Sequence, residues 1–224
     1  MSKYDAKPLF PEKLDTFSLM ERDSKVQTTD FARACSPNPD FAEFIQSLPK
    51  VLGGKHFRSL VEAWGVARQK KRSMILGMGA HVIKVGLNPV IIDLMQQGWI
   101  TALALNGAGI IHDFEVALSG ATSEDVAKNI PGGEFGMARE TGEHLNAAAA
   151  IATRQDIGLG EAVGQMLSSS GYPFLEQSLL ASAYKMSIPV SVHVALGTDT
   201  IHFHPQVSGE DLGRSSLRDF FLFC

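Results

Sequence analysis

The stretch TALALNGAGIIHDFEVALSG, residues 101–120, combines a short apolar run, a glycine-rich turn and a helical pattern. Residues 100–105 are apolar and bounded by breakers, as expected of a strand buried on both faces of a parallel sheet. Gly107 and Gly109 allow a tight turn and a close approach of the backbone, because neither has a Cβ atom. Residues 110–118 have helical spacing, so the first amides of that helix would point back toward the turn. This order favours a site for phosphate or another anion, or else tight packing of strand on helix.

The same alternation of strand and helix patterns continues along the chain. Residues 73–78 predict a strand, and residues 88–98 predict a helix with Pro89 in its first turn and Gly98 as its stop. Further helices are expected at 122–130, capped by Thr122, in the alanine-rich part of 132–155 and at 173–187, before a β-branched strand at 188–196. Strands that alternate with helices of this length indicate parallel βαβ units. The sequence predicts an α/β fold, a Rossmann-like open parallel sheet with flanking helices.

The first 40 residues differ from the rest because they are polar and rich in breakers. We expect residues 1–40 to form an extended arm that wraps a neighbour or is partly disordered. Residues 41–224 are expected to form the α/β domain, beginning with helices at 41–48 and 57–69.

The bulk composition limits the classes of partner. With 224 residues, 45% of them hydrophobic, the chain can bury a sizeable core. Its net charge of −4 gives no electrostatic footprint for nucleic acid. Two cysteines fit a reducing compartment, and no segment approaches the roughly 18 apolar residues of a membrane span. We therefore expect a cytoplasmic protein without nucleic-acid or membrane partners.

Candidate site residues lie where the predicted strands end, because open α/β sheets bind ligands beyond the carboxyl ends of their strands. Three such exits, at 77–81, 106–113 and 193–204, carry histidines. His202 and His204 would share one strand face and could bind a metal, while His112, supported by Asp113, could act as an acid–base group or contact a substrate. Alternatively, each histidine simply bonds a nearby backbone carbonyl. The dinucleotide fingerprint GxGxxG is absent, since Val82 stands where the third glycine belongs.

The ordered motifs between residues 72 and 203 resemble those of the deoxyhypusine synthase family. The resemblance is carried by the paired strand–helix units of residues 73–118, by GGEFG at 132–136 and by SIPVSVHVALGTDTIHFH at 187–204. It implies a Rossmann-like homotetramer that binds NAD and spermidine. The family oxidises spermidine by hydride transfer to NAD and then moves the aminobutyl group through an imine on a lysine, although bacterial relatives act on free polyamines.

The same resemblance assigns site residues. It places one NAD-binding loop at Gly79, Ala80 and His81 and a second at Asn106, Gly107 and Ala108, and it places substrate-binding residues at His112 and Asp199. We expect His112 and Asp199 to line one pocket with the loop of residues 106–109.

The sequence also departs from the family pattern. Ala80 and His81 replace a serine and an asparagine, and His112 replaces a glutamate. The chain lacks the family's C-terminal segment with its catalytic lysine, so we assign no catalytic residue and expect no synthesis of deoxyhypusine. The leading hypothesis is an NAD-dependent aminobutyl transferase acting on spermidine or a related polyamine. A catalytically inactive scaffold or binding protein of the same fold and a metal-dependent hydrolase are the alternatives.

Overall fold

The structure, a computed structural model, describes residues 3–6 and 10–224. Residues 1–2 and 7–9 of the expected arm lie outside the described residues. The chain divides into two compact units, residues 1–63 and residues 64–224. Each unit is described by itself.

The first unit contains short helical segments held by local hydrogen bonds. Its elements are η1 (Pro11–Lys13), η2 (Leu19–Glu21), η3 (Thr28–Asp30), α1 (Phe41–Ser47) and the first part of α2 (Leu52–Gln69). Asp40 caps α1 by accepting a hydrogen bond of 2.7 Å from the Glu43 amide. The guanidinium of Arg58 donates to the carbonyls of Ile45 and Leu48 at 2.7 and 2.6 Å, so this side chain ties the end of α1 to α2.

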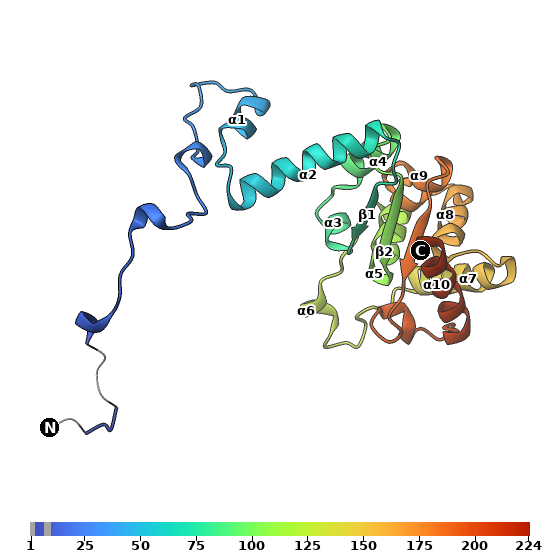
Figure 1. Ribbon diagram of the computed structural model, residues 1–224. Helices are drawn as coiled ribbons and strands as arrows, with labels where there is room; N and C mark the ends of the chain where they lie inside the picture. Colours follow the sequence, from blue (N-terminus) through green and yellow to red (C-terminus); the bar gives the residue numbers. More distant parts are fainter. Residues whose placement is uncertain (1–2, 7–9) are drawn as a thin grey trace. The chain divides into compact units, whose positions relative to one another are not determined.

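The second unit is built around a three-stranded sheet (Figure 1). β1 (Ile75–Met78), β2 (Ala102–Asn106) and β3 (Val190–His193) are parallel and lie in the order β1-β2-β3. The pairs Gly77–Ala104 and Ala104–Ser191 set the register, so the three carboxyl ends meet at one edge of the sheet. The predicted α/β class, an open parallel sheet with flanking helices, is confirmed.

Helices of the second unit supply most of the core around the sheet. In chain order they are α3 (His81–Lys84), α4 (Asn88–Gln96), α5 (Gly107–Ser119), α6 (Val126–Asn129), α7 (Arg139–Gln155), α8 (Leu159–Ser170), η4 (Leu175–Gln177), α9 (Leu179–Lys185), η5 (Thr200–Phe203) and α10 (Gly209–Phe223). Leu103 and Leu105 of β2 and Phe114 of α5 are almost completely buried in this core. As predicted, Pro89 lies in the first turn of α4, and Gly98 follows that helix with a φ of +71°.

Helix α10 protects the outer edge of β3. The Val192 amide donates to Asp219 at 2.8 Å, and the Val194 amide donates to Ser216 at 2.9 Å. The Ser216 hydroxyl in turn donates to the Val192 carbonyl at 3.0 Å. Edge strands expose unpaired backbone groups, and here side chains of a helix satisfy them instead of a further strand.

Several local predictions were wrong. His202 and His204 do not share a strand face, because residues 200–203 form the 3-10 helix η5. The single helix expected at 173–187 is divided into η4 and α9, since Ser178 caps α9 by accepting from the Ala181 amide. The exit after β1 contains a short helix, α3, and the sequence patterns had not indicated α8 or α10.

Candidate functional site

A pocket of about 200 Å³ lies beside the start of α5, between the end of α3, the segment around α6 and the turn after β3. We call it the Asp199 pocket. Its lining comprises Lys84, Ala108, Ile111, His112, Glu115, Ser123, Glu124, Val126, Phe135, Gly136, Ala138, Thr141, Thr198, Asp199 and Thr200. The segment around α6 and the turn after β3, which supply much of this lining, both lie toward the lower end of the sheet in Figure 1.

A larger pocket, of about 470 Å³, lies beside the amino end of β3. Pro189 and Val190, at the amino end of β3, line it together with Leu180 and Leu222. Glu161 is the charged residue of its lining, and no predicted site residue contributes to it. Open α/β sheets bind ligands at the carboxyl ends of their strands, so the smaller pocket is the candidate site.

The exit of β2 is shaped by the close approach of Asp199. Asn106 caps α5 by accepting a hydrogen bond of 3.0 Å from the Gly109 amide. A Cβ atom at Gly107 would lie 2.0 Å from Asp199 Oδ2, so residue 107 has to be glycine for this carboxylate to approach. The start of α5, where the sequence favoured an anion site, therefore already faces a carboxylate of the chain itself.

Asp199 is buried without a complete set of hydrogen-bond donors. Its side chain is 9% exposed, and its Oδ2 atom lies 3.9 Å from His202 Nε2. The Nδ1 atom of His202 accepts from the Gly197 and Asp199 amides at 3.1 and 3.2 Å, which assigns the proton of the neutral ring to Nε2. Among the described residues, neither Asp199 Oδ2 nor His202 Nε2 has a hydrogen-bond partner. Burial raises the pKa of Asp199, against the opposing effects of His202 and Thr198.

His112 belongs to a hydrogen-bonded chain that ends on a carboxylate. Its Nδ1 atom lies 2.6 Å from the Thr122 hydroxyl, which donates its own proton to Glu115. Thr122 must therefore accept from His112, which assigns the proton of the neutral ring to Nδ1 and leaves Nε2 as an acceptor. Burial of Glu115 opposes ionisation, but the hydrogen bonds from His112 and Thr122 outweigh it and lower the pKa of Glu115. The expected role of Thr122 as a helix cap was wrong, since Asp125 caps α6.

Asp113 does not support His112. Its carboxylate is completely buried and accepts from the Ser178 hydroxyl at 2.6 Å and from the Leu179 and Leu180 amides at 2.7 and 3.1 Å. Successive side chains of an α-helix point about 100° apart, so adjacent residues rarely share a target. Asp113 therefore caps α9, and the predicted pairing with His112 was wrong.

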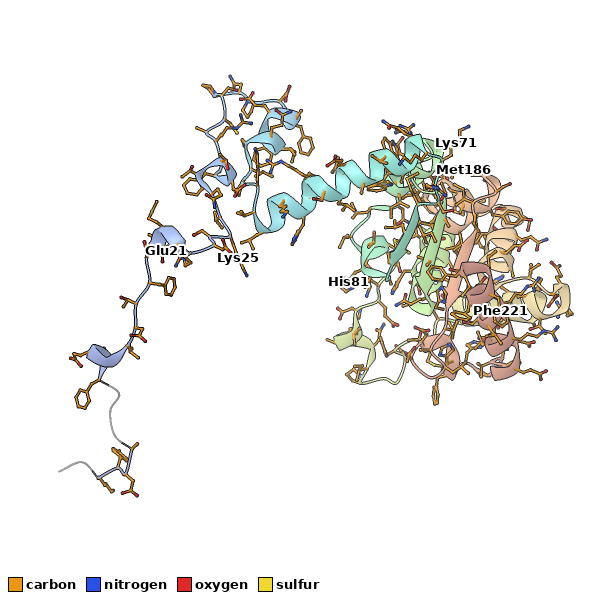
Figure 2. The ribbon with its side chains drawn as sticks, in the orientation of Figure 1. Glu21, Lys25, Lys71, His81, Met186 and Phe221 are labelled. Carbon is orange, nitrogen blue, oxygen red and sulfur yellow. The ribbon has the colours of Figure 1, made fainter. Side chains whose placement is uncertain are left out.

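The predicted site residues divide into two groups. His112 and Asp199 line the Asp199 pocket together, and Ala108 is the residue of the expected loop 106–109 that joins them. The other five, Gly79, Ala80, His81, Asn106 and Gly107, lie at the same edge of the sheet but outside the lining of this pocket. There, a Cβ atom on Gly79 would contact the side-chain amide nitrogen (Nδ2) of Asn106 at 3.7 Å. His81 is exposed on α3 (Figure 2).

The histidines at the strand exits do not converge. His193 lies against Phe223 and bonds Ser191, while His204 packs on Gly142, where a Cβ atom would lie 2.2 Å from its ring. Within residues 3–6 and 10–224, no three histidine, cysteine or acidic side chains lie close enough together to hold a metal ion. The metal-dependent alternative therefore has no support from the geometry of these residues.

The sequence patterns did not indicate that three charged residues belong to the site. These residues are Lys84, Glu115 and Glu124. Glu115 could have been found, because it lies three positions after His112 and thus on the same face of a predicted helix. Glu124 and Lys84 had no such signal. Both approach the pocket only through the folding of loops and short helices around α5.

Comparisons with known proteins give distant structural similarities alone. No family model matches the chain, and no curated protein matches its sequence. Solved structures with a similar fold include an apo arginine dihydrolase, ArgZ, of the ornithine–ammonia cycle in cyanobacteria, with 16% identity, a TM-score of 0.43, and coverage of 66% of this chain and 20% of that one. A conserved LOR/SDH protein of Methanococcus maripaludis S2 has 17% identity and a TM-score of 0.46, with coverage of 86% and 52%.

A candidate deoxyhypusine synthase of Entamoeba histolytica is also similar, with 13% identity, a TM-score of 0.42, and coverage of 69% of this chain and 60% of that one. This chain thus spans less than two thirds of the length of each of these proteins. All three TM-scores lie below 0.5 and all three identities below 20%.

Proposed function

We propose that the protein binds a small amine, a polyamine or a related compound, in the Asp199 pocket. The observation that carries this proposal is the Asp199 carboxylate, whose Oδ2 atom is buried at a pocket without a hydrogen-bond donor. A buried acceptor without a partner costs free energy, and an ammonium group would supply both the donor and the opposite charge. Glu115 and Glu124 add two further carboxylates to the lining, so its charge favours a cationic group beside Asp199.

His112 gives the same pocket a proton acceptor. In the neutral ring the Nε2 atom is the acceptor, because Nδ1 is engaged by Thr122 and, through it, by Glu115. We propose that Nε2 takes the proton from a bound ammonium group and that Glu115 stabilises the imidazolium that results. The free amine is the form that can react at nitrogen, so this step would prepare the ligand for chemistry.

NAD, which the family resemblance implies, fits only part of this edge. Asp199 stands against Gly107, so a pyrophosphate beside residues 106–108 would meet a carboxylate at close range. At the β1 exit, a Cβ atom on Gly79 would meet the side-chain nitrogen of Asn106 at 3.7 Å rather than a carboxylate. We therefore propose NAD as a ligand of the β1 exit alone and derive no chemical step through it.

The complete activity of the family, aminobutyl transfer from spermidine within a homotetramer, is a further proposal. The amine pocket would supply its substrate-binding step, whereas an inactive scaffold would keep the pocket without the transfer. Large apolar side chains in the first unit support assembly with other copies, since Phe17 is 74% exposed and Met20 is 91% exposed. Light scattering at micromolar concentration tests this, and a monomer would contradict it.

Titration calorimetry with spermidine tests the amine site directly. We expect Asp199→Asn to weaken binding at least about tenfold, because the amide keeps the shape of the carboxylate but not its charge. Asp156→Asn is the matched control, since it removes the same charge from an exposed residue at the end of α7, where the backbone conformation also suits asparagine. Equal affinities for the wild type and Asp199→Asn would overturn the proposal.

A further inference from the structure

Lys84 is the one basic side chain with a permanent charge in the lining of the Asp199 pocket. It lies at the end of α3, which packs beside α5, and it is exposed. It takes part in none of the ion pairs formed by the described residues, although three carboxylates line the same pocket. Its ammonium group is therefore available to a ligand.

Two of the three carboxylates of the lining already have partners on both oxygens. Glu115 accepts from Thr122 on one oxygen and from Thr141 at 3.5 Å on the other. Glu124 accepts from the Gly136 amide at 2.7 Å and from the Asn129 side chain at 2.9 Å. Asp199 differs because its Oδ2 atom has no donor. The pocket thus offers a ligand one carboxylate oxygen without a donor, Asp199 Oδ2, and one unpaired ammonium, Lys84.

The two charges reach the pocket from different sides. Lys84 follows β1 and Asp199 follows β3, and these strands flank β2 in the sheet. Neighbouring strands are about 4.8 Å apart, so β1 and β3 are separated by roughly 10 Å where they end. Lys84 and Asp199 lie several residues beyond those ends and form no ion pair with each other, so their charged groups are more than 4.0 Å apart. A ligand that meets both side chains therefore needs a cationic and an anionic group that are separated from each other.

We propose that the natural ligand is an amino acid whose ammonium and carboxylate groups are separated by a short carbon chain. Its ammonium would bind Asp199 and its carboxylate would bind Lys84, with Ile111 and the methylene groups of the ligand in apolar contact. This inference rests on the amine site proposed above and narrows its substrate class. A diamine would place its second ammonium near Lys84, where like charges repel.

Two probes of matched length separate the possibilities. 5-Aminopentanoate and 1,5-diaminopentane have similar chains and differ in one terminal charge. Titration calorimetry on the full chain should show the amino acid binding at least tenfold more tightly than the diamine. Lys84→Met should abolish that preference by weakening the amino acid, whereas Lys185→Met, at an exposed lysine outside the pocket, should leave it unchanged. Circular dichroism spectra of both variants verify that they fold.

Each outcome has one meaning. If the diamine binds as well as the amino acid or better, the substrate class proposed here is wrong and the amine site stands. If Lys84→Met keeps the preference of the wild type, Lys84 is not the group that recognises the carboxylate, and the inference is overturned. If neither probe nor spermidine binds, the amine site itself fails and this inference fails with it.

Discussion

Asp113 lies within helix α5 and Asp199 approaches the start of that helix, yet their carboxylates have different partners. Asp113 receives hydrogen bonds from the Ser178 hydroxyl and from the Leu179 and Leu180 amides, and its two oxygens are both engaged. Asp199 lines a pocket, and its Oδ2 atom has no donor. Asp113 is completely buried and its oxygens are supplied with donors, whereas Asp199 is partly buried and one of its oxygens has no donor.

We interpret this difference as one between a structural carboxylate, Asp113, and the proposed binding carboxylate, Asp199. The helix start at α9 satisfies the charge of Asp113 with groups of the chain itself, so nothing remains for a ligand to contribute. The chain leaves one oxygen of Asp199 without a partner and keeps it beside a pocket. We infer that a ligand stabilises Asp199 in the way that Ser178 and α9 stabilise Asp113.

The largest effect is expected at the structural site. Asp113→Ala leaves the Ser178 hydroxyl and the Leu179 and Leu180 amides buried without an acceptor, and we expect a loss of at least about 3 kcal/mol in the free energy of unfolding. Urea denaturation followed by circular dichroism measures it. Asp93→Ala, at an exposed aspartate within α4, is the control and should change stability by less than about 1 kcal/mol, because alanine favours a helix. Similar losses in the two variants would show that the hydrogen bonds of Asp113 do not stabilise the fold.

The free energy of unfolding should also depend on pH because Asp113 titrates. Burial raises the pKa of Asp113 to about 6, against the opposing hydrogen bonds, whereas the unfolded chain ionises near 3.8. The native state therefore retains this proton to a higher pH than the unfolded chain does. The stability that Asp113 contributes is fully present below pH 3.8 and is lost as the pH rises through 6. We expect a fall of about 2 kcal/mol over this range relative to Asp113→Asn, which does not titrate.

Denaturation curves at several pH values provide the measurement, and the comparison with Asp113→Asn removes the contributions of other groups. Asp219, whose pKa burial also raises to about 6, remains in both proteins and cancels. Parallel pH profiles for the wild type and the variant would show that Asp113 does not titrate in this range.

Gly107→Ala should damage the binding site more than the fold. The new Cβ atom would lie 2.0 Å from Asp199 Oδ2, so the carboxylate must move away from the start of α5. Forced shifts of this kind cost about 1–2 kcal/mol, and we expect spermidine affinity to fall more than tenfold. Gly213→Ala in α10 is the matched control, because no atom lies within 4 Å of its new Cβ and alanine favours a helix. Unchanged binding by Gly107→Ala would mean that the position of Asp199 does not matter.

Local patterns predicted the scaffold well, because strands and helix ends depend on neighbouring residues. The parallel strands, the turn at Gly98 and the approach allowed by Gly107 all follow from short stretches of sequence. The strand prediction for residues 200–203 was wrong because a local hydrogen-bond pattern overrides their alternation. Their alternation resembles a strand, but Asp199 and His202 form a capping box that closes a 3-10 turn.

The partners within the site could not be predicted because they come from distant parts of the chain. Thr122 is a residue type that often caps helices, yet its hydroxyl lies between His112 and Glu115 of the preceding helix. Asp113 bonds residues that lie 65 to 67 positions later. Which hydrogen bonds a polar side chain makes is decided by tertiary packing, so a sequence pattern can place a residue near a site without giving its role.

The smallest predicted effect concerns the stability of Asp199→Asn, and it opposes the effect at Asp113. A buried charge without a complete set of donors destabilises the native state, and burial accordingly raises the pKa of Asp199. The neutral amide removes that charge while it keeps the packing against Gly107. We expect the free energy of unfolding at pH 7 to stay equal to that of the wild type or to rise by up to about 1 kcal/mol. Urea denaturation without ligand measures this difference. Saturating spermidine should then stabilise the wild type and leave Asp199→Asn nearly unchanged, because only a protein that binds the ligand gains from it. A clear loss of stability in Asp199→Asn without ligand would show that Asp199 is held by the chain as Asp113 is, and the distinction between the two aspartates would collapse.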